Sequence, residues 1–322
     1  MGLLFKILRL SPYIEVVVRR IYWSSPLLIK MASKRNLRKE VKTQVVEERS
    51  LGNILEFLKN NGVESGSLII VHSSAEALKP TGKSPSQIID ELLTLLGKGG
   101  TLAMPAFPKY RDEPTGIDRM NADVSDIVLE YNVKKTIPWT GLLPYKLMRY
   151  PGAVRSRHPL NTMVAVGPLA EPMMENNLLG DKPLPCGNHS SWNYCAMHDA
   201  KIVALGVDMA HSLTMIHVAE DSYEESWPIA GWYRDRKFVV VDNDSRTDVV
   251  VRERHPKWAK YYAERTLSKE LKNSELIESA VIDGISVEVL DARKLLNFLN
   301  GRKNSAYPYF MLPSKVHKNE TD

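Results

Sequence analysis

The chain of 322 residues is long enough to form one large domain or two smaller ones around a sizeable core. Its hydrophobic fraction of 43% and charged fraction of 25% are those of an ordinary soluble globular protein, which excludes the disordered, collagen-like and low-complexity classes. Residues 1–50 hold eleven Lys and Arg against four Asp and Glu, a charge of +7. Since the net charge of the whole chain is +5, the remaining residues together carry −2. Because the excess of positive charge lies at one end, nucleic-acid binding by the whole protein is not indicated.

The first segment, residues 1–48, is predicted to be a basic amphipathic arm that ends in a polar linker. None of its apolar runs reaches the roughly 18–20 residues that cross a bilayer. Lys6 and Arg9 interrupt the pattern expected of a cleaved secretory signal. Apolar residues interleaved with cations suit a helix on an anionic membrane surface, such as the inner membrane face. They suit equally a helix packed on its own domain or on a partner subunit, so both alternatives stay open.

The second segment, residues 49–322, alternates strand and helix patterns. Ser84, Pro85 and Gln87 form a predicted capping box at the start of one helix, and Gly97 is predicted to end it. Short apolar runs predict strands at residues 67–72, 100–107, 162–167, 201–206, 237–241, 248–251 and 285–290. Helical spacing predicts helices at or near residues 50–62, 85–96, 140–150, 190–199, 211–224, 256–273 and 291–300.

This alternation predicts an α/β domain with a mixed central sheet flanked by helices. The pattern between residues 237 and 251 is typical of a β-hairpin. We expect this hairpin to supply antiparallel strands to the central sheet, which would make that sheet mixed.

The stretch "TMIHVAE" contains Thr214, His217 and Glu220 at a spacing of three. On a helix this spacing places the three side chains on one face. A histidine followed by a carboxylate suits a general base with an orienting acid, but it suits a solvated helix face as well. A metal site is a third alternative, and it would need further ligands such as His72 or His158.

Several separated motifs, in order along the chain, resemble one protein family: "LIIVHSS", "GTLAMPAF", "TIPWTGLLP", "GAVRSRHPLNTMVAVGPLAE", "ALGV" and "TMIHVAE". They are similar to the antibiotic N-acetyltransferase family, whose best-known members are aminoglycoside 3-N-acetyltransferases. The resemblance covers roughly residues 50 to 300 and leaves residues 1–48 as an addition. It implies coenzyme A-dependent acyl transfer to an amine, within an α/β fold.

The resemblance also implies roles for individual residues. His217 would be the general base, Glu220 would orient it, and Thr214 would contact the substrate or the thioester oxygen. Family segments expected near coenzyme A contain His72, Ser73, Ser74, Ser156 and His158. Without the resemblance, Ser73 or Ser74 would be interpreted as a helix cap.

Outside the family motifs, Lys83 stands beside the start of a predicted helix, where a phosphate could bind. The two cysteines, Cys186 and Cys195, form no metal-type pair and indicate no disulfide scaffold. A reducing cytoplasm is therefore the expected compartment.

The sequence thus predicts an N-acyltransferase that uses acetyl-CoA or another acyl-CoA, without a metal, to modify an amino group of an amino sugar. Because the N-terminal arm is basic, we expect the acceptor to belong to surface-polysaccharide biosynthesis near the membrane. One alternative is an aminoglycoside 3-N-acetyltransferase that confers antibiotic resistance, and another is a membrane-associated binding protein without catalysis. The oligomeric state stays open, a homo-oligomer included.

Overall fold

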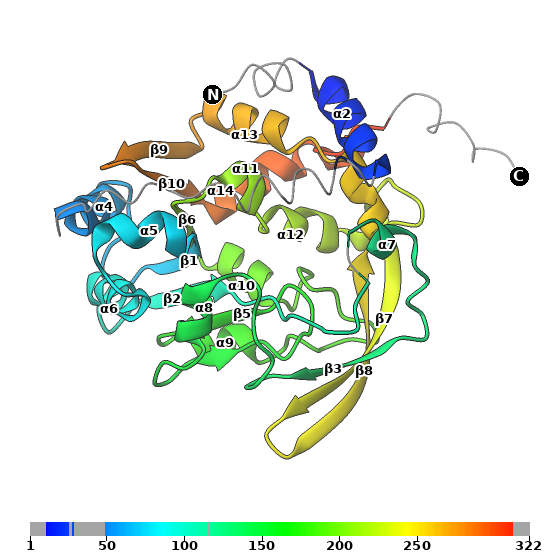
Figure 1. Cartoon of the computed structure of the whole chain (residues 1–322), viewed down its shortest axis with the longest axis horizontal. Helices are drawn as coiled ribbons and strands as arrows, with labels where there is room; N and C mark the ends of the chain where they lie inside the picture. The colour runs from blue at the N-terminus through cyan, green and yellow to red at the C-terminus, as the bar shows by residue number, and fades with distance from the viewer. Residues whose placement is uncertain (1–10, 26–27, 29–48, 115, 312–322) are drawn as a thin grey trace, which may run out of the picture.

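The computed structural model describes residues 11–25, 28, 49–114 and 116–311. Its centre is a seven-stranded sheet (Figure 1) with the strand order β4 (Val154–Arg155), β5 (Met163–Val166), β2 (Thr101–Pro105), β1 (Leu68–Ser73), β6 (Lys201–Leu205), β10 (Ile285–Asp291) and β9 (Ile277–Ile282). Strand β1 runs parallel to both of its neighbours, β2 and β6, whereas the other neighbouring strands are antiparallel. The predicted mixed central sheet is confirmed.

Helices cover both faces of this sheet. Ile69 and Val71 of β1 belong to one core cluster, while Leu68 and Ile70 belong to the other, because successive side chains of a strand point to opposite faces. The first cluster contains residues of α4 (Arg49–Asn60), α6 (Pro85–Leu96) and α8 (Leu142–Leu147). The second contains residues of α9 (Ala170–Met174), α10 (Ser191–Met197), α13 (Glu264–Asn273) and α14 (Ala292–Asn300).

Helix α6 begins with the predicted capping box. The Ser84 hydroxyl accepts a hydrogen bond from the Gln87 backbone N–H, and the Gln87 side-chain oxygen accepts one from the Ser84 N–H. Each contact satisfies a backbone donor that the helix itself leaves without a partner. The helix ends at Leu96, directly before Gly97, as predicted.

The predicted β-hairpin forms, but it lies in a second sheet and not in the central one. Strands β7 (Tyr233–Asp242) and β8 (Ser245–Arg254) pair antiparallel, and β3 (Val128–Asn132) pairs parallel to β7. This three-stranded sheet stands beside the main body, at the lower right of Figure 1. The antiparallel pairs of the central sheet come from β4, β5, β9 and β10 instead.

Helix α2 (Pro12–Ser24) packs on the body of the protein beside α13 (Figure 1). Its Glu15 side chain is buried and accepts hydrogen bonds from the backbone N–H groups of Arg265 (2.9 Å) and Thr266 (3.0 Å). These two donors lie in the first turn of α13, so Glu15 caps that helix from outside. Arg19 forms an ion pair with Glu264 at 2.6 Å.

For residues 12–24, the structure therefore shows packing on the protein's own domain, one of the two alternatives that the sequence left open. The rest of the predicted arm, residues 1–10, 26–27 and 29–48, lies outside the described residues. In the part of the chain that is described, no helix is long and apolar enough to cross a membrane.

Short elements connect these layers. Among the described residues they are α5 (Ala75–Leu78), α7 (Gly116–Asn121), α11 (Met209–Ser212), α12 (Ile216–Asp221) and the 3-10 helices η1 (Lys79–Thr81), η2 (Glu224–Ser226), η3 (Pro256–Tyr261) and η4 (Lys303–Ser305).

Candidate active site

The carboxyl ends of the parallel strands β1, β2 and β6 lie at one edge of the central sheet, where ligands of open α/β folds commonly bind. A cavity of about 250 Å³ lies at this edge, and we call it the strand-end cavity. Most of its wall is apolar, with hydroxyl and imidazole groups from β1 and from the segment after β6. Its lining includes Val71, His72, Ser73, Phe107, Trp139 and Thr214.

The segment predicted as one helix over residues 211–224 forms two short helices, α11 and α12, with a break at Leu213. The Leu213 backbone (φ −85°, ψ 73°) leaves the helical region while its side chain stays in the core. Thr214 therefore lies in the turn before α12 and not on the helix itself. Its carbonyl oxygen accepts the His217 backbone N–H at 3.0 Å, and both residues line one cavity. The prediction of one continuous helix is wrong, whereas His217 and Glu220 do share a helix, α12.

His217 and Glu220 form a close pair on α12. The ring Nδ1 of His217 lies 3.0 Å from Oε1 of Glu220. The glutamate side chain is 2% exposed and the histidine side chain 18%. The Tyr309 hydroxyl donates a second hydrogen bond to the same carboxylate oxygen, at 2.7 Å.

Arg254, the last residue of β8, lies close to both members of this pair. One of its terminal nitrogens is 3.3 Å from His217 Nδ1 and 4.0 Å from Glu220 Oε1. A single ring nitrogen cannot accept from the guanidinium and donate to the carboxylate at once. We assign the proton to Nδ1, facing the buried carboxylate, because a charge-assisted hydrogen bond is the stronger of the two. The lone pair of His217 then lies on Nε2.

The pKa values of the pair follow from its surroundings. Burial and the nearby Arg254 guanidinium lower the pKa of His217, and the opposing attraction of Glu220 does not reverse the shift. Burial alone would raise the pKa of Glu220, but His217, Arg254 and Tyr309 outweigh it and lower that pKa. At neutral pH the site therefore holds a neutral imidazole beside an ionised carboxylate.

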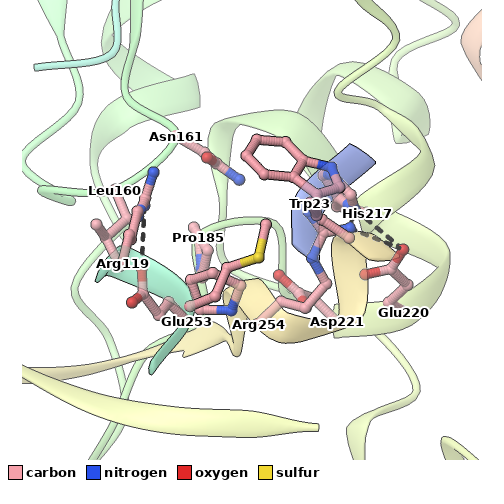
Figure 2. A pocket seen from close by; sticks show the side chains of 13 residues that line it. Trp23, Arg119, Leu160, Asn161, Pro185, His217, Glu220, Asp221, Glu253 and Arg254 are labelled. Atoms are coloured by element: carbon pink, nitrogen blue, oxygen red, sulfur yellow. Dashed lines mark hydrogen bonds and ion pairs between the residues drawn. The ribbon is translucent and has the colours of Figure 1, made fainter. Parts of the chain in front are cut away.

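His217 lines two cavities other than the strand-end cavity. One, of about 320 Å³, is lined by Trp23 of α2 together with His217, Glu220 and Arg254, and we call it the α2 cavity (Figure 2). The other has a volume of about 240 Å³. We call it the linking cavity, because it shares lining residues with both of the others, Thr214 with the strand-end cavity and His217 with the α2 cavity.

Of the residues predicted near coenzyme A, two lie on the strand-end cavity. His72 and Ser73 line it, and the His72 side chain is buried. Burial lowers the pKa of His72 to about 4, so this ring is neutral. Ser74 adopts the simpler of its two predicted roles: its hydroxyl accepts the Ala77 N–H at 3.2 Å and so caps α5.

Ser156 and His158 are buried and held by internal contacts. The Ser156 hydroxyl accepts the His158 backbone N–H at 3.1 Å. The ring of His158 contacts the backbone of Leu160 through Nδ1 and the carbonyl of Pro183 through Nε2. Both ring nitrogens are thus used inside the protein, and neither residue lines any of the three cavities.

Lys83 likewise lies outside these cavities, in the turn before α6. Its backbone N–H donates to the Thr81 hydroxyl at 3.2 Å. Among the described residues, no three His, Cys, Asp or Glu side chains are arranged to hold a metal ion. Cys186 and Cys195 are both free and buried, and burial raises the pKa of each thiol.

Three residues of the site were not found from the sequence: Trp23, Arg254 and Tyr309. Each is far from His217 along the chain and belongs to no motif with it. Arg254 lies beyond the strand predicted at residues 248–251, and only the longer β8 of the structure brings it to His217. Trp23 lies within the predicted amphipathic arm, and nothing in its spacing connects it to a binding site.

Comparison with known proteins places this chain in a family. A family model described as aminoglycoside 3-N-acetyltransferase matches residues 70–302. Aminoglycoside N(3)-acetyltransferase III of Serratia marcescens is 32% identical over 176 residues, which cover 53% of this chain and 64% of the relative. The type VIII protein of Streptomyces fradiae is 28% identical over 214 residues, covering 59% and 71%. The match thus spans somewhat less than two thirds of the first of these relatives.

Solved structures with the same fold have lower identity. The structure titled AAC-IIIb binary with CoASH superimposes with a TM-score of 0.65 at 19% identity, covering 80% of this chain and 97% of that one. Apo aminoglycoside acetyltransferase AAC(3)-IVa gives 0.61 at 21% identity, covering 85% and 95%. These likenesses support the fold, and the family model spans most of the chain. The chain therefore belongs to the aminoglycoside 3-N-acetyltransferase family, as the sequence motifs predicted.

Proposed function

We propose that this protein is an acetyl-CoA-dependent N-acetyltransferase that modifies an amino group of an aminoglycoside or related amino sugar. The observation that carries the proposal is the position of His217. A neutral imidazole, held by a buried carboxylate, lines both the α2 cavity and the linking cavity, which shares Thr214 with the strand-end cavity. Transfer between two substrates needs a base in such a position, because the donor and the acceptor must reach it from different sides.

The strand-end cavity suits the pantetheine arm of coenzyme A. Its wall combines apolar groups with His72, Ser73 and Thr214, which matches a chain of methylenes interrupted by amides. The α2 cavity is left for the acceptor. In this arrangement Thr214, on the strand-end and linking cavities, is the hydroxyl best placed to donate to the thioester oxygen. Ser74 is less suited, because its hydroxyl caps α5 and Ser74 lines none of the three cavities.

The proposed reaction is a direct attack. The amine nitrogen forms a C–N bond with the thioester carbonyl carbon as the C–S bond breaks. Nε2 of His217 takes the proton that the amine loses and returns it to the departing sulfur, which leaves as a thiol. Glu220 keeps the ring in the required tautomer and stabilises the imidazolium while it exists.

The two relatives named above favour the aminoglycoside alternative over a surface-polysaccharide acceptor. A thiol-release assay with acetyl-CoA and a panel of aminoglycosides and simple amino sugars tests the proposal. We expect release of free coenzyme A that depends on an amine, with one acetyl group found on the amine product. Absence of release with every amine would remove the proposal and leave a non-catalytic binding protein.

The pH dependence of kcat reports on His217. Since the active base is the neutral ring and its pKa is lowered, kcat should stay level above pH 6.5 and fall as the pH drops below that value. Arg254 is one cause of the lowered pKa, so Arg254→Met should move the acidic limb to higher pH. The measurement is kcat at saturating substrates between about pH 5 and 9. A limb that starts above the ordinary histidine pKa in the unmodified enzyme would contradict the assignment.

A further inference from the structure

Helix α2 presents an apolar face to solvent. Ile14, Val17 and Ile21 follow one another at spacings of three and four residues, so their side chains lie on one side of the helix. We call this side the outer face of α2. All three residues are exposed, Ile21 to 57%. An ordinary surface helix has the opposite pattern, because it turns its apolar residues toward the core and its charged residues toward water.

The inner side of α2 holds the charged residues that an ordinary helix would expose. Glu15 is 1% exposed where it caps α13, and Arg19 is held in its ion pair with the first residue of α13. Val16 is fully buried, and Trp23 lines the α2 cavity. These contacts attach the helix to the body of the protein, so the outer face is not needed to hold it in place.

The exposed apolar surface extends beyond the outer face itself. Tyr13 at the start of the helix is 50% exposed, and Leu28, a few residues after its end, is 40% exposed. Five of the twelve large apolar residues that are exposed in the described part of the chain thus lie between residues 13 and 28. Such a concentration is typical of a surface that binds a partner.

Positive charge stands beside this apolar surface. The 3-10 helix η3 packs against α2, and the two elements together contain four Lys and Arg residues against one acid, the buried Glu15. Arg20 lies over the ring of Tyr261, and Lys257 and Lys260 belong to η3. Residues 1–50 as a whole carry a charge of +7. A partner that covers the outer face therefore gains from negative charge of its own.

Three kinds of partner could cover an apolar helix face, and the surroundings of α2 favour one of them. A second copy would bring the same cations together, because a two-fold dimer pairs each surface with itself. A helix-binding groove on another protein has walls on both sides of the helix, and on one side of α2 the packed η3 already occupies that space. An anionic membrane surface has no such walls and supplies both an apolar layer and negative charge.

We propose that the outer face of α2 docks on an anionic membrane surface. The side chains of Ile14, Val17 and Ile21 enter the boundary between head groups and acyl chains, and the neighbouring cations face the lipid phosphates. The helix lies along the surface and does not cross the bilayer. This inference is independent of the proposed function, because it rests on exposed side chains and on charge and not on any reaction.

The test is co-sedimentation of the full-length chain with two kinds of vesicle. One kind is phosphatidylcholine alone, and the other contains about 30% phosphatidylglycerol as the anionic lipid. We expect the partition coefficient to be about tenfold higher or more on the anionic vesicles. Raising the salt concentration from about 0.05 M to about 0.5 M should reduce that difference, because salt screens the attraction between the cations and the head groups.

Two triple variants separate the apolar contribution from the charge. Ile14→Ser, Val17→Ser and Ile21→Ser together should lower the partition coefficient on anionic vesicles about tenfold or more, since the apolar area that enters the membrane is lost. Arg20→Gln, Lys257→Gln and Lys260→Gln together should lower it by a similar factor on anionic vesicles and leave partition on phosphatidylcholine unchanged. Thermal unfolding of each variant verifies that the protein stays folded.

The matched control is Val128→Ser. Val128 is 55% exposed and belongs to β3, which lies at the lower edge of the molecule in Figure 1, whereas α2 lies at the top. Its replacement removes exposed apolar area from a different part of the surface. Both partition coefficients should therefore stay unchanged.

Three results would overturn the proposal. The first is a full-length chain that binds neither kind of vesicle. The second is vesicle binding that the triple serine variant leaves unaltered, which would place the contact elsewhere in the protein. The third is a dimer in solution that this variant dissociates, which would make a second copy the partner of the outer face. Failure of the acetyltransferase assay would leave the vesicle results as they are, so the two proposals can fail separately.

Discussion

Replacing His217 with Asn should lower kcat by about 10²- to 10⁴-fold, the usual contribution of a general base. Asn keeps a polar side chain of moderate size in a partly buried position, so the fold should survive. It cannot accept the proton of an attacking amine near neutral pH. Steady-state kinetics with acetyl-CoA and the best amine from the panel give kcat and both KM values.

The control for this variant is His198→Asn. His198 is an exposed histidine at the end of α10, where its ring stacks on Tyr194 at a centroid distance of 3.8 Å. Its replacement should leave kcat unchanged. A His217→Asn enzyme with normal kcat would show that the amine loses its proton without this ring. A loss confined to the KM for acetyl-CoA would make His217 a binding residue and not a base.

The second large effect is expected from Glu220→Gln, which should reduce kcat by about 10²-fold or more. Glutamine fills the same space but carries no charge, so the imidazolium that forms during attack loses its stabilising partner. Its NH₂ group can also donate to His217 Nδ1 and so move the ring proton to Nε2, the position that must be vacant. Because the carboxylate raises the His217 pKa, the remaining activity should have its acidic limb at a lower pH.

Tyr309→Phe is the matched control for the Glu220 variant. It removes the hydrogen bond to the same carboxylate oxygen and the one that the hydroxyl accepts from Arg254, and it leaves the charge of Glu220 in place. We expect a smaller reduction in kcat than for Glu220→Gln, about tenfold, since each hydrogen bond contributes about 1 kcal/mol. If both variants lose the same activity, the hydrogen-bond network matters and the charge of Glu220 does not. If Glu220→Gln keeps full activity, the proposed pairing is wrong.

The central sheet could be predicted because its parallel strands are buried on both faces. Such strands appear in the sequence as unbroken apolar runs, as in β1 and β6. Strands β3 and β9 were not predicted. Each has polar and apolar residues side by side, so neither forms the unbroken apolar run that marks a buried strand. The break at Leu213 was missed for another reason. Leucine favours helices, so the residue type at this position does not signal the non-helical backbone found there.

The site could be predicted only where it is local in sequence. The spacing of His217 and Glu220 fixes their contact as soon as both lie on one helix. Arg254 is 37 residues from His217, and Tyr309 is 89 residues from Glu220, so the fold alone brings them together. The structural roles of Ser74 and His158 could not be separated from ligand binding, because hydroxyl and imidazole groups serve both purposes equally well.

The central claim is that His217 stands between an acetyl donor in the strand-end cavity and an amine in the α2 cavity. A crystal structure of the His217→Asn enzyme with coenzyme A and the preferred amine tests it most directly. We predict the thiol sulfur beside Thr214 and the amine nitrogen within about 3 Å of the side-chain amide at position 217. Coenzyme A bound in a different cavity, or an amine separated from that side chain by the protein wall, would contradict the account.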